Sequence, residues 1–105
     1  MVEPTHWWKV TMLFPLFDND GNPFAEAIWR WWRIEITRLA RGFTDTGVVT
    51  GWWQGMSDQN RSVVIIVKTE REIDALRRFL VRARKKFRQR AMYFDYHPTH
   101  FEEVQ

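Results

Sequence analysis

Along residues 7–14, apolar side chains recur at every second position, a spacing typical of a β-strand with one buried face. That face carries Trp8, Val10, Met12 and Phe14. Three further strands are predicted over residues 46–54, 62–68 and 91–97. The run VVIIV at residues 63–67 contains no polar position, which is expected of a strand that is buried on both faces.

Two segments show the helical spacing of apolar positions instead. The first helix is predicted over residues 23–40, with Asn22 as its N-cap and Gly42 closing its C-terminus. A second helix is predicted after Thr69, which forms a capping box with Glu72. The apolar stripe of the first helix consists of Phe24, Ala25, Ile28, Trp29, Trp32, Ile36, Leu39 and Ala40.

The predicted order β-α-β-β-α-β indicates a single α+β domain over residues 1–105. Right-handed connections place both helices on one face of a four-stranded antiparallel sheet, which is the ferredoxin-like architecture. The first and third strands are expected at the centre of that sheet. Two helices cover only one face, so the composition of the other face becomes the main clue to function.

Large apolar residues occupy both alternating sets of positions on the predicted strands, so we expect an apolar open face. Two residues of the first helix, Trp31 and Ile34, also fall outside its apolar stripe. We expect Trp31 to be partly exposed or covered by a neighbouring subunit. The candidate residues for a ligand cleft or an oligomer interface are Trp7, Trp8, Trp31, Ile34, Trp52, Trp53, Tyr93 and Tyr96.

The net charge of +3 is unevenly distributed. Eight of the sixteen basic residues lie within residues 77–90, where no acidic residue occurs. A local basic field attracts anions, and the candidate anion-binding residues are Arg82, Lys85, Lys86 and Arg88. However, cations near the C-terminus of a helix are also favoured by the helix dipole. The open sheet face also lacks the basic and aromatic signature of an RNA-recognition module, so nucleic acid is not the expected partner. Anion or nucleic-acid binding through the basic end of the second helix is an alternative function.

Known catalytic motifs are absent from the sequence, and no cysteine is present. The segment DNDGN lacks the spacing of a calcium loop and predicts a tight turn. His97 and His100 lie in a tail region, and we predict no metal site. Some proteins of this architecture are monooxygenases or haem-degrading enzymes, which use Trp, His and Asn in an open-face cleft. His6, Asn19 and Asn22 are residues of those types, so an enzyme is a further alternative.

Several stretches resemble a family of small uncharacterised bacterial proteins, a domain of unknown function. They are PLFDNDGNPF at residues 15–24, Trp29, GFT at 42–44, VVTGW at 48–52, the apolar run at 63–67, and KKFRQRAMYF at 85–94. The likeness covers most of the chain, but residues 55–61, which we expect to form a polar loop, lack a Glu that the family pattern contains. The resemblance implies a ferredoxin-like fold, no established activity and no functional residue.

Residues 1–10 lack a basic region followed by an apolar region, so we expect no signal peptide. The longest apolar run, at 63–67, is too short to span a bilayer. The sequence therefore predicts a soluble, cytoplasmic, tryptophan-rich protein without a cofactor, and the family resemblance implies a bacterial one. We expect it to bind itself, as a dimer or larger assembly, or a small apolar or aromatic ligand on the open sheet face.

Overall fold

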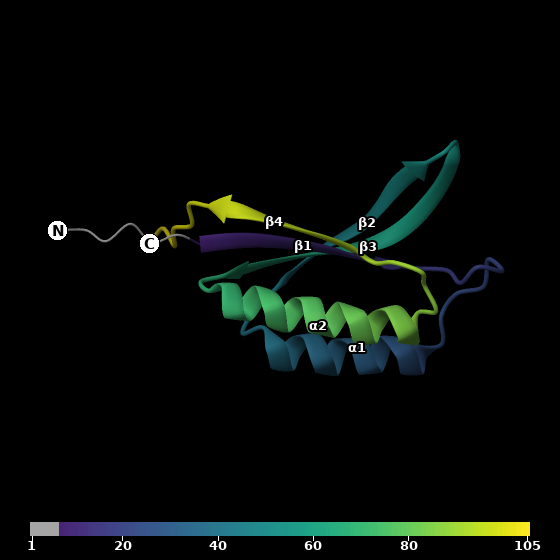
Figure 1. Ribbon diagram of the computed structural model, residues 1–105, viewed down its shortest axis with the longest axis horizontal. Helices are drawn as coiled ribbons and strands as arrows, with labels where there is room; N and C mark the ends of the chain where they lie inside the picture. The colour runs from purple at the N-terminus through teal and green to yellow at the C-terminus, as the bar shows by residue number, and fades with distance from the viewer. Residues whose placement is uncertain (1–6) are drawn as a thin grey trace.

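The computed structural model describes residues 7–105. Its elements are β1 (Trp7–Pro15), α1 (Glu26–Leu39), β2 (Thr44–Trp53), β3 (Met56–Val67), α2 (Glu70–Lys86) and β4 (Tyr93–Thr99). The four strands form one antiparallel sheet in the order β2-β3-β1-β4, so β1 and β3 are central, as predicted. Both helices cover the same face of this sheet (Figure 1). The chain therefore has the predicted ferredoxin-like α+β fold.

The hydrophobic core lies between the sheet and the two helices. Phe14 of β1 is at its centre, with its ring 5.5 Å from that of Trp32 and 5.9 Å from that of Phe87. Such edge-to-face and tilted aromatic contacts add to the stabilisation from burial alone. The fully buried side chains that build the core include Val10, Met12, Val63, Ile65, Ile36, Leu76 and Phe79.

The predicted boundaries of α1 are wrong at both ends. The helix begins at Glu26 after Ala25, and no side chain caps it. Asn22 does not act as the N-cap, because it closes the preceding loop with Asp18 through two hydrogen bonds of 2.7 and 2.9 Å. At the other end the backbone becomes extended at Ala40, so Gly42 is not part of the cap. The stripe is confirmed within the helix, with Trp32 and Ile36 buried, but the predicted stripe residue Ala25 is exposed and precedes the helix.

The sequence also placed the β2–β3 turn wrongly. Residues 55–61 were expected to form a polar loop, but β3 begins at Met56 and pairs with β2 from its first residue. The turn consists of Gln54 and Gly55 alone, with φ angles of 49° and 79°. Two successive residues in the left-handed region make the tight turn that matches the twist of a hairpin. The β2–β3 hairpin therefore extends past Pro15, where β1 ends.

Trp31 is partly exposed, as predicted. Its ring stacks on that of Phe79 in α2, with the ring centres 5.7 Å apart and an angle of 26° between the planes. The expected helical phase of α1 is thus confirmed. Trp31 lies where the two helices meet, at the border of the core.

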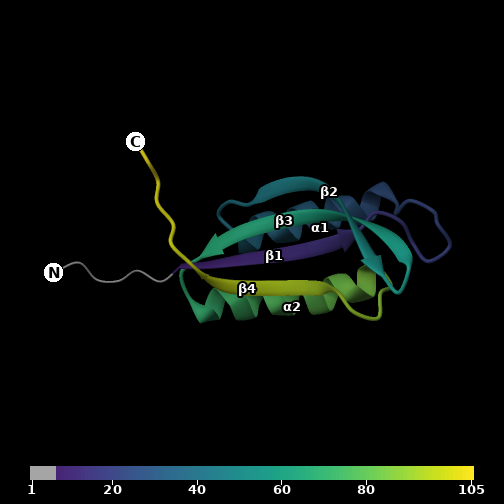
Figure 2. The ribbon, with the colours of Figure 1, turned by 90° about the horizontal axis from the view of Figure 1, so that it is seen from above.

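The open face of the sheet is mixed and not uniformly apolar. Thr11 pairs with Val64 on one side and Asp95 on the other, and these three side chains share the open face. Phe94 and Tyr96 lie on the opposite face, because they pair with the buried Met12 and Val10. The open face is therefore only partly apolar, because Leu13, Val64 and Ile66 lie on it together with Thr11 and Asp95. Figure 2 shows this face, with the helices behind the strands.

Candidate functional site

The β2–β3 hairpin presents the most exposed tryptophans of the described chain. Trp52 and Trp53 are 72% and 74% exposed, and Met56, which pairs with Trp53, is 70% exposed. The hairpin rises away from the helices on the open side of the sheet (Figure 1). No element of the described chain, residues 7–105, covers these side chains. We call Trp52, Trp53 and Met56 the hairpin tip.

A cleft of about 500 Å³ lies between the hairpin tip and the start of β4. We call it the tip cleft. Its walls contain three of the predicted site residues, Trp52, Trp53 and Tyr93. The remaining lining residues are Leu13, Pro15, Gly51, Asp58, Asn60, Gln89, Ala91 and Met92. Among the described residues, Asp58 is therefore the only charged side chain that lines this cleft, although the chain as a whole is basic.

The polar side of the tip cleft is formed by β3. The amide of Asn60 donates to the carboxylate of Asp58 at 3.3 Å, which helps to orient both groups. The Asn60 residue is buried, whereas Asp58 is exposed. Sequence reasoning missed this pair because it assigned residues 55–61 to a loop. Their spacing of two, read as a strand, would have placed both side chains on one face.

Tyr93 forms the opposite wall of the tip cleft. Its phenol donates a hydrogen bond to the carboxylate of Asp95 on the same strand. This hydrogen bond, together with the negative charge of Asp95, raises the pKa of the Tyr93 phenol above its usual value. Tyr93 therefore stays protonated at neutral pH and offers an uncharged aromatic ring to the cleft.

The other predicted site residues do not join the tip cleft. Trp7 lines a second cleft, of about 820 Å³, beside the end of α1, where Lys68 lies 4.9 Å from its ring. Trp8 and Tyr96 form an edge-to-face pair at 5.8 Å on the helix side of the sheet. Ile34 is an exposed residue of α1. The structure thus divides the predicted set between separate surfaces.

The predicted anion-binding residues Arg82, Lys85, Lys86 and Arg88 are all exposed, and the first three belong to α2. Within residues 7–105, no three His, Cys, Asp or Glu side chains gather in a way that could hold a metal ion. His100 lies 3.5 Å from Glu102, and His97 belongs to β4. The candidate His6 lies outside the described residues. Over the described range, no helix combines the length and apolar character needed to cross a membrane.

No family model and no curated protein matches this chain. Among solved structures, it is similar to a phage SAM lyase in complex with S-methyl-5'-thioadenosine. The TM-score is 0.57 at 12% sequence identity, and the match covers 93% of this chain and 84% of the lyase chain. At this low identity the likeness shows a shared fold alone.

Proposed function

We propose that this protein is a small-ligand-binding module, and that its ligand combines a planar aromatic group with a positive charge. One observation carries the proposal. The tip cleft is lined by the aromatic residues Trp52, Trp53 and Tyr93 and by a single charged residue, Asp58, in a chain whose net charge is +3. Exposed tryptophan rings favour stacking with flat ligands and attract cations to their faces.

The size and polarity of the tip cleft fit this class of ligand. A volume of about 500 Å³ lies within the range of small-molecule sites. Asp58 and Asn60 supply a carboxylate and an amide, which can hydrogen-bond the polar edge of a heterocycle. An anionic ligand is disfavoured there, because the carboxylate would repel it and no lysine or arginine from the described chain lines the cleft.

The structural neighbour adds support for a nucleoside-like ligand. The phage lyase was solved with S-methyl-5'-thioadenosine, which joins a flat purine base to a thioether. In S-adenosylmethionine the corresponding sulfur is a cationic sulfonium. S-adenosylhomocysteine carries the same amino acid on a neutral thioether, so these last two compounds form a matched pair of probes that differ by one methyl group and one positive charge at sulfur.

Isothermal titration calorimetry with both compounds tests the proposal. We expect the sulfonium compound to bind more tightly, because the cleft offers one carboxylate and several aromatic faces. Asp58→Asn should remove most of this preference. It should raise the Kd of the sulfonium compound about tenfold and leave the Kd of the thioether unchanged. Trp53→Ala should weaken both compounds, and Trp7→Ala, outside the tip cleft, should weaken neither. Equal binding by Trp53→Ala and the unchanged protein would contradict the proposal.

A second candidate function is self-association through the hairpin tip. The observation that favours it is the exposure of Trp52, Trp53 and Met56, at 70–74% each, on a hairpin that extends beyond its own sheet. Contiguous exposed apolar groups of this kind mark interaction sites. Sedimentation velocity at micromolar concentration should show a dimer or larger assembly, which Met56→Glu should dissociate. A monomer at all concentrations would exclude this function.

A further inference from the structure

The outer surface of α2 carries a second charge feature, independent of the tip cleft. Its basic residues are not equivalent. Arg77 turns toward β4, where its guanidinium lies 3.4 Å from the Tyr96 hydroxyl and 5.5 Å from the Phe94 ring. Arg84 donates to the backbone oxygen of Gln89 at 3.3 Å. These contacts set Arg77 and Arg84 apart from the remaining cations.

The remaining cations form a continuous stripe. Arg78, Arg82 and Lys85 recur at intervals of four and three residues, so they follow one another along α2 at about 5.4 Å per turn. Lys86 and Arg88 extend this stripe beyond the last turn. Within residues 7–105, no ion pair involves Arg78, Lys85, Lys86 or Arg88. We call Arg78, Arg82, Lys85, Lys86 and Arg88 the basic stripe.

An aromatic ring lies beside this basic stripe. Trp31 of α1 stacks on Phe79 of α2, and the ammonium of Lys86 lies 5.4 Å from the centre of the Trp31 ring. The guanidinium of Arg82 lies 5.9 Å from the ring of Phe79. Trp31 is partly exposed, and a base that stacks on its ring would take the place of the Lys86 ammonium.

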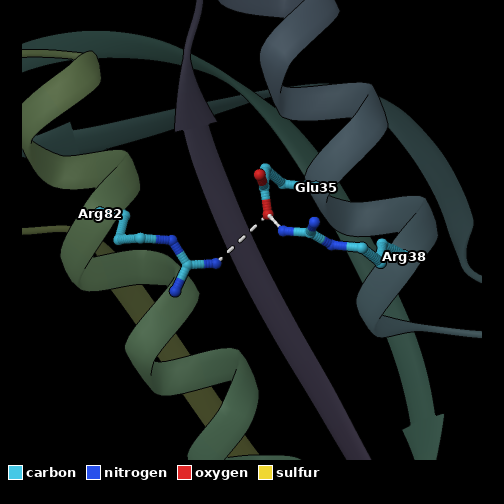
Figure 3. Close-up of polar contacts among 3 residues, drawn as sticks. All are labelled: Glu35, Arg38 and Arg82. Atoms are coloured by element: carbon cyan, nitrogen blue, oxygen red, sulfur yellow. Dashed lines mark hydrogen bonds and ion pairs between the residues drawn. The ribbon is translucent and has the colours of Figure 1, made fainter.

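Only one acidic side chain of the described residues contacts the basic stripe. Glu35 of α1 lies 2.6 Å from Arg38 and 3.4 Å from Arg82 (Figure 3). Its carboxylate is shared between two guanidinium groups, so it cannot neutralise both. Arg82 has the longer contact and is the more readily available of the two for an external anion.

We propose that the basic stripe and Trp31 bind a single-stranded nucleic acid. The cations would contact successive phosphates, and a base would stack at Trp31. Strands of this kind are held by basic grooves with aromatic side chains on which bases stack. A membrane surface fits less well, because the apolar face of α2 is buried in the core and cannot enter a bilayer. An acidic protein would use the cations but would not require the aromatic ring.

Fluorescence anisotropy with labelled 12-nucleotide oligo-dU and oligo-U provides the test. The triple variant Lys85→Gln/Lys86→Gln/Arg88→Gln should bind at least about tenfold more weakly at low salt. In this variant the slope of log affinity against log salt concentration should become less steep by about 2, for roughly three lost phosphate contacts. The matched control Arg30→Gln/Arg33→Gln/Arg41→Gln removes the same charge from exposed positions outside α2 and should bind nearly normally. Binding of either oligonucleotide supports the proposal, and the stronger one identifies the sugar that is preferred.

Trp31 separates nucleic acid from other polyanions. Trp31→Ala should weaken oligonucleotide binding about tenfold and leave the binding of polyglutamate unchanged. Trp31→Phe, which keeps a ring against Phe79, should retain most of the affinity. The proposal would be overturned by an absence of binding at 50 mM salt or by equal loss of affinity in both triple variants. It would also be overturned if polyglutamate or phosphatidylserine vesicles bound more tightly than the oligonucleotides, or if Trp31→Ala kept full affinity. Circular dichroism of every variant distinguishes lost binding from lost folding.

Discussion

The guanidinium carbon of Arg61 lies 4.5 Å from the centre of the Trp32 ring, so a β3 cation covers the largest buried side chain of the core. The same guanidinium donates from Nε to the Asp45 carboxylate at 2.7 Å. Asp45 belongs to β2, whose start is exposed. Through Arg61, an edge strand is thus tied both to the sheet centre and to α1. A cation–π contact and a charged hydrogen bond act on one side chain.

Asp45→Asn should therefore lower the free energy of unfolding by about 1 kcal/mol at neutral pH, as for a partly exposed ion pair. The hydrogen bond from Arg61 holds the pKa of the Asp45 carboxyl below its usual value of 3.8. Because the folded-state pKa is lowered, this stabilisation is present above pH 3.8 and is lost as the pH falls through the lowered pKa. Urea unfolding from pH 7 to pH 2 should show the difference between variant and wild type shrinking only at the acid end. Asp20→Asn, in an exposed loop, serves as the control, and an unchanged difference at acid pH would refute the ion-pair explanation.

Truncating a core side chain should destabilise the fold far more than truncating a side chain of the hairpin tip. Phe87 is fully buried and contacts Phe24 and Trp29 at ring distances of 4.9 and 5.2 Å. Phe87→Ala should cost about 3–5 kcal/mol, because it leaves a cavity among these rings. Trp52→Ala should change the free energy of unfolding by no more than about 0.5 kcal/mol, since Trp52 is mostly exposed. Chemical denaturation measures both, and a large loss in Trp52→Ala would show that the hairpin tip serves the fold.

The sequence was sufficient for the architecture because the core positions carry periodic patterns. Alternation in β1, the unbroken apolar run in β3 and the stripe containing Trp32 and Ile36 each specify one element. The order of these elements along the chain is then compatible with only a few sheet topologies. The capping box at Thr69 was predicted correctly for the same reason, since it depends on residues only three positions apart.

The tip cleft could not be predicted in this way. Residues 57–60 are all polar, and residues 57–59 are exposed, so no hydrophobic alternation marks them as a strand. The hairpin exists because of the turn at Gln54 and Gly55, and the cleft exists because that hairpin rises over the open face (Figure 1). Asp58 and Tyr93 come together only through this bend. Long-range geometry of that kind leaves no local sequence pattern.

The N-cap of α2 offers a test of local stabilisation. The Thr69 hydroxyl accepts a hydrogen bond from the Glu72 backbone N–H at 3.1 Å and donates to the Glu72 carboxylate at 3.0 Å. Thr69→Ala should lower stability by about 1 kcal/mol, whereas Thr69→Ser keeps the hydroxyl and should be nearly neutral. Hydrogen exchange should locate the loss in the first turn of α2. Equal stability of the Ala and Ser variants would show that the capping box contributes nothing.

The hairpin turn should control the hairpin tip without affecting the core. Gly55 has a φ of 79°, and a methyl group added to its Cα would meet no atom within 4 Å, so Gly55→Ala introduces backbone strain and no clash. We expect a cost of about 1 kcal/mol. Gly42→Ala is the matched control, because its surroundings are equally open and its backbone is not left-handed.

Gln54→Asn should have the opposite effect and stabilise the turn, since Asn tolerates the left-handed region better than Gln. Amide exchange in residues 51–58 should rise in Gly55→Ala and fall in Gln54→Asn, while exchange at Val10 and Ile65 stays constant. If Gly42→Ala loosened the hairpin as much as Gly55→Ala, the left-handed turn would not be what holds the tip cleft in place.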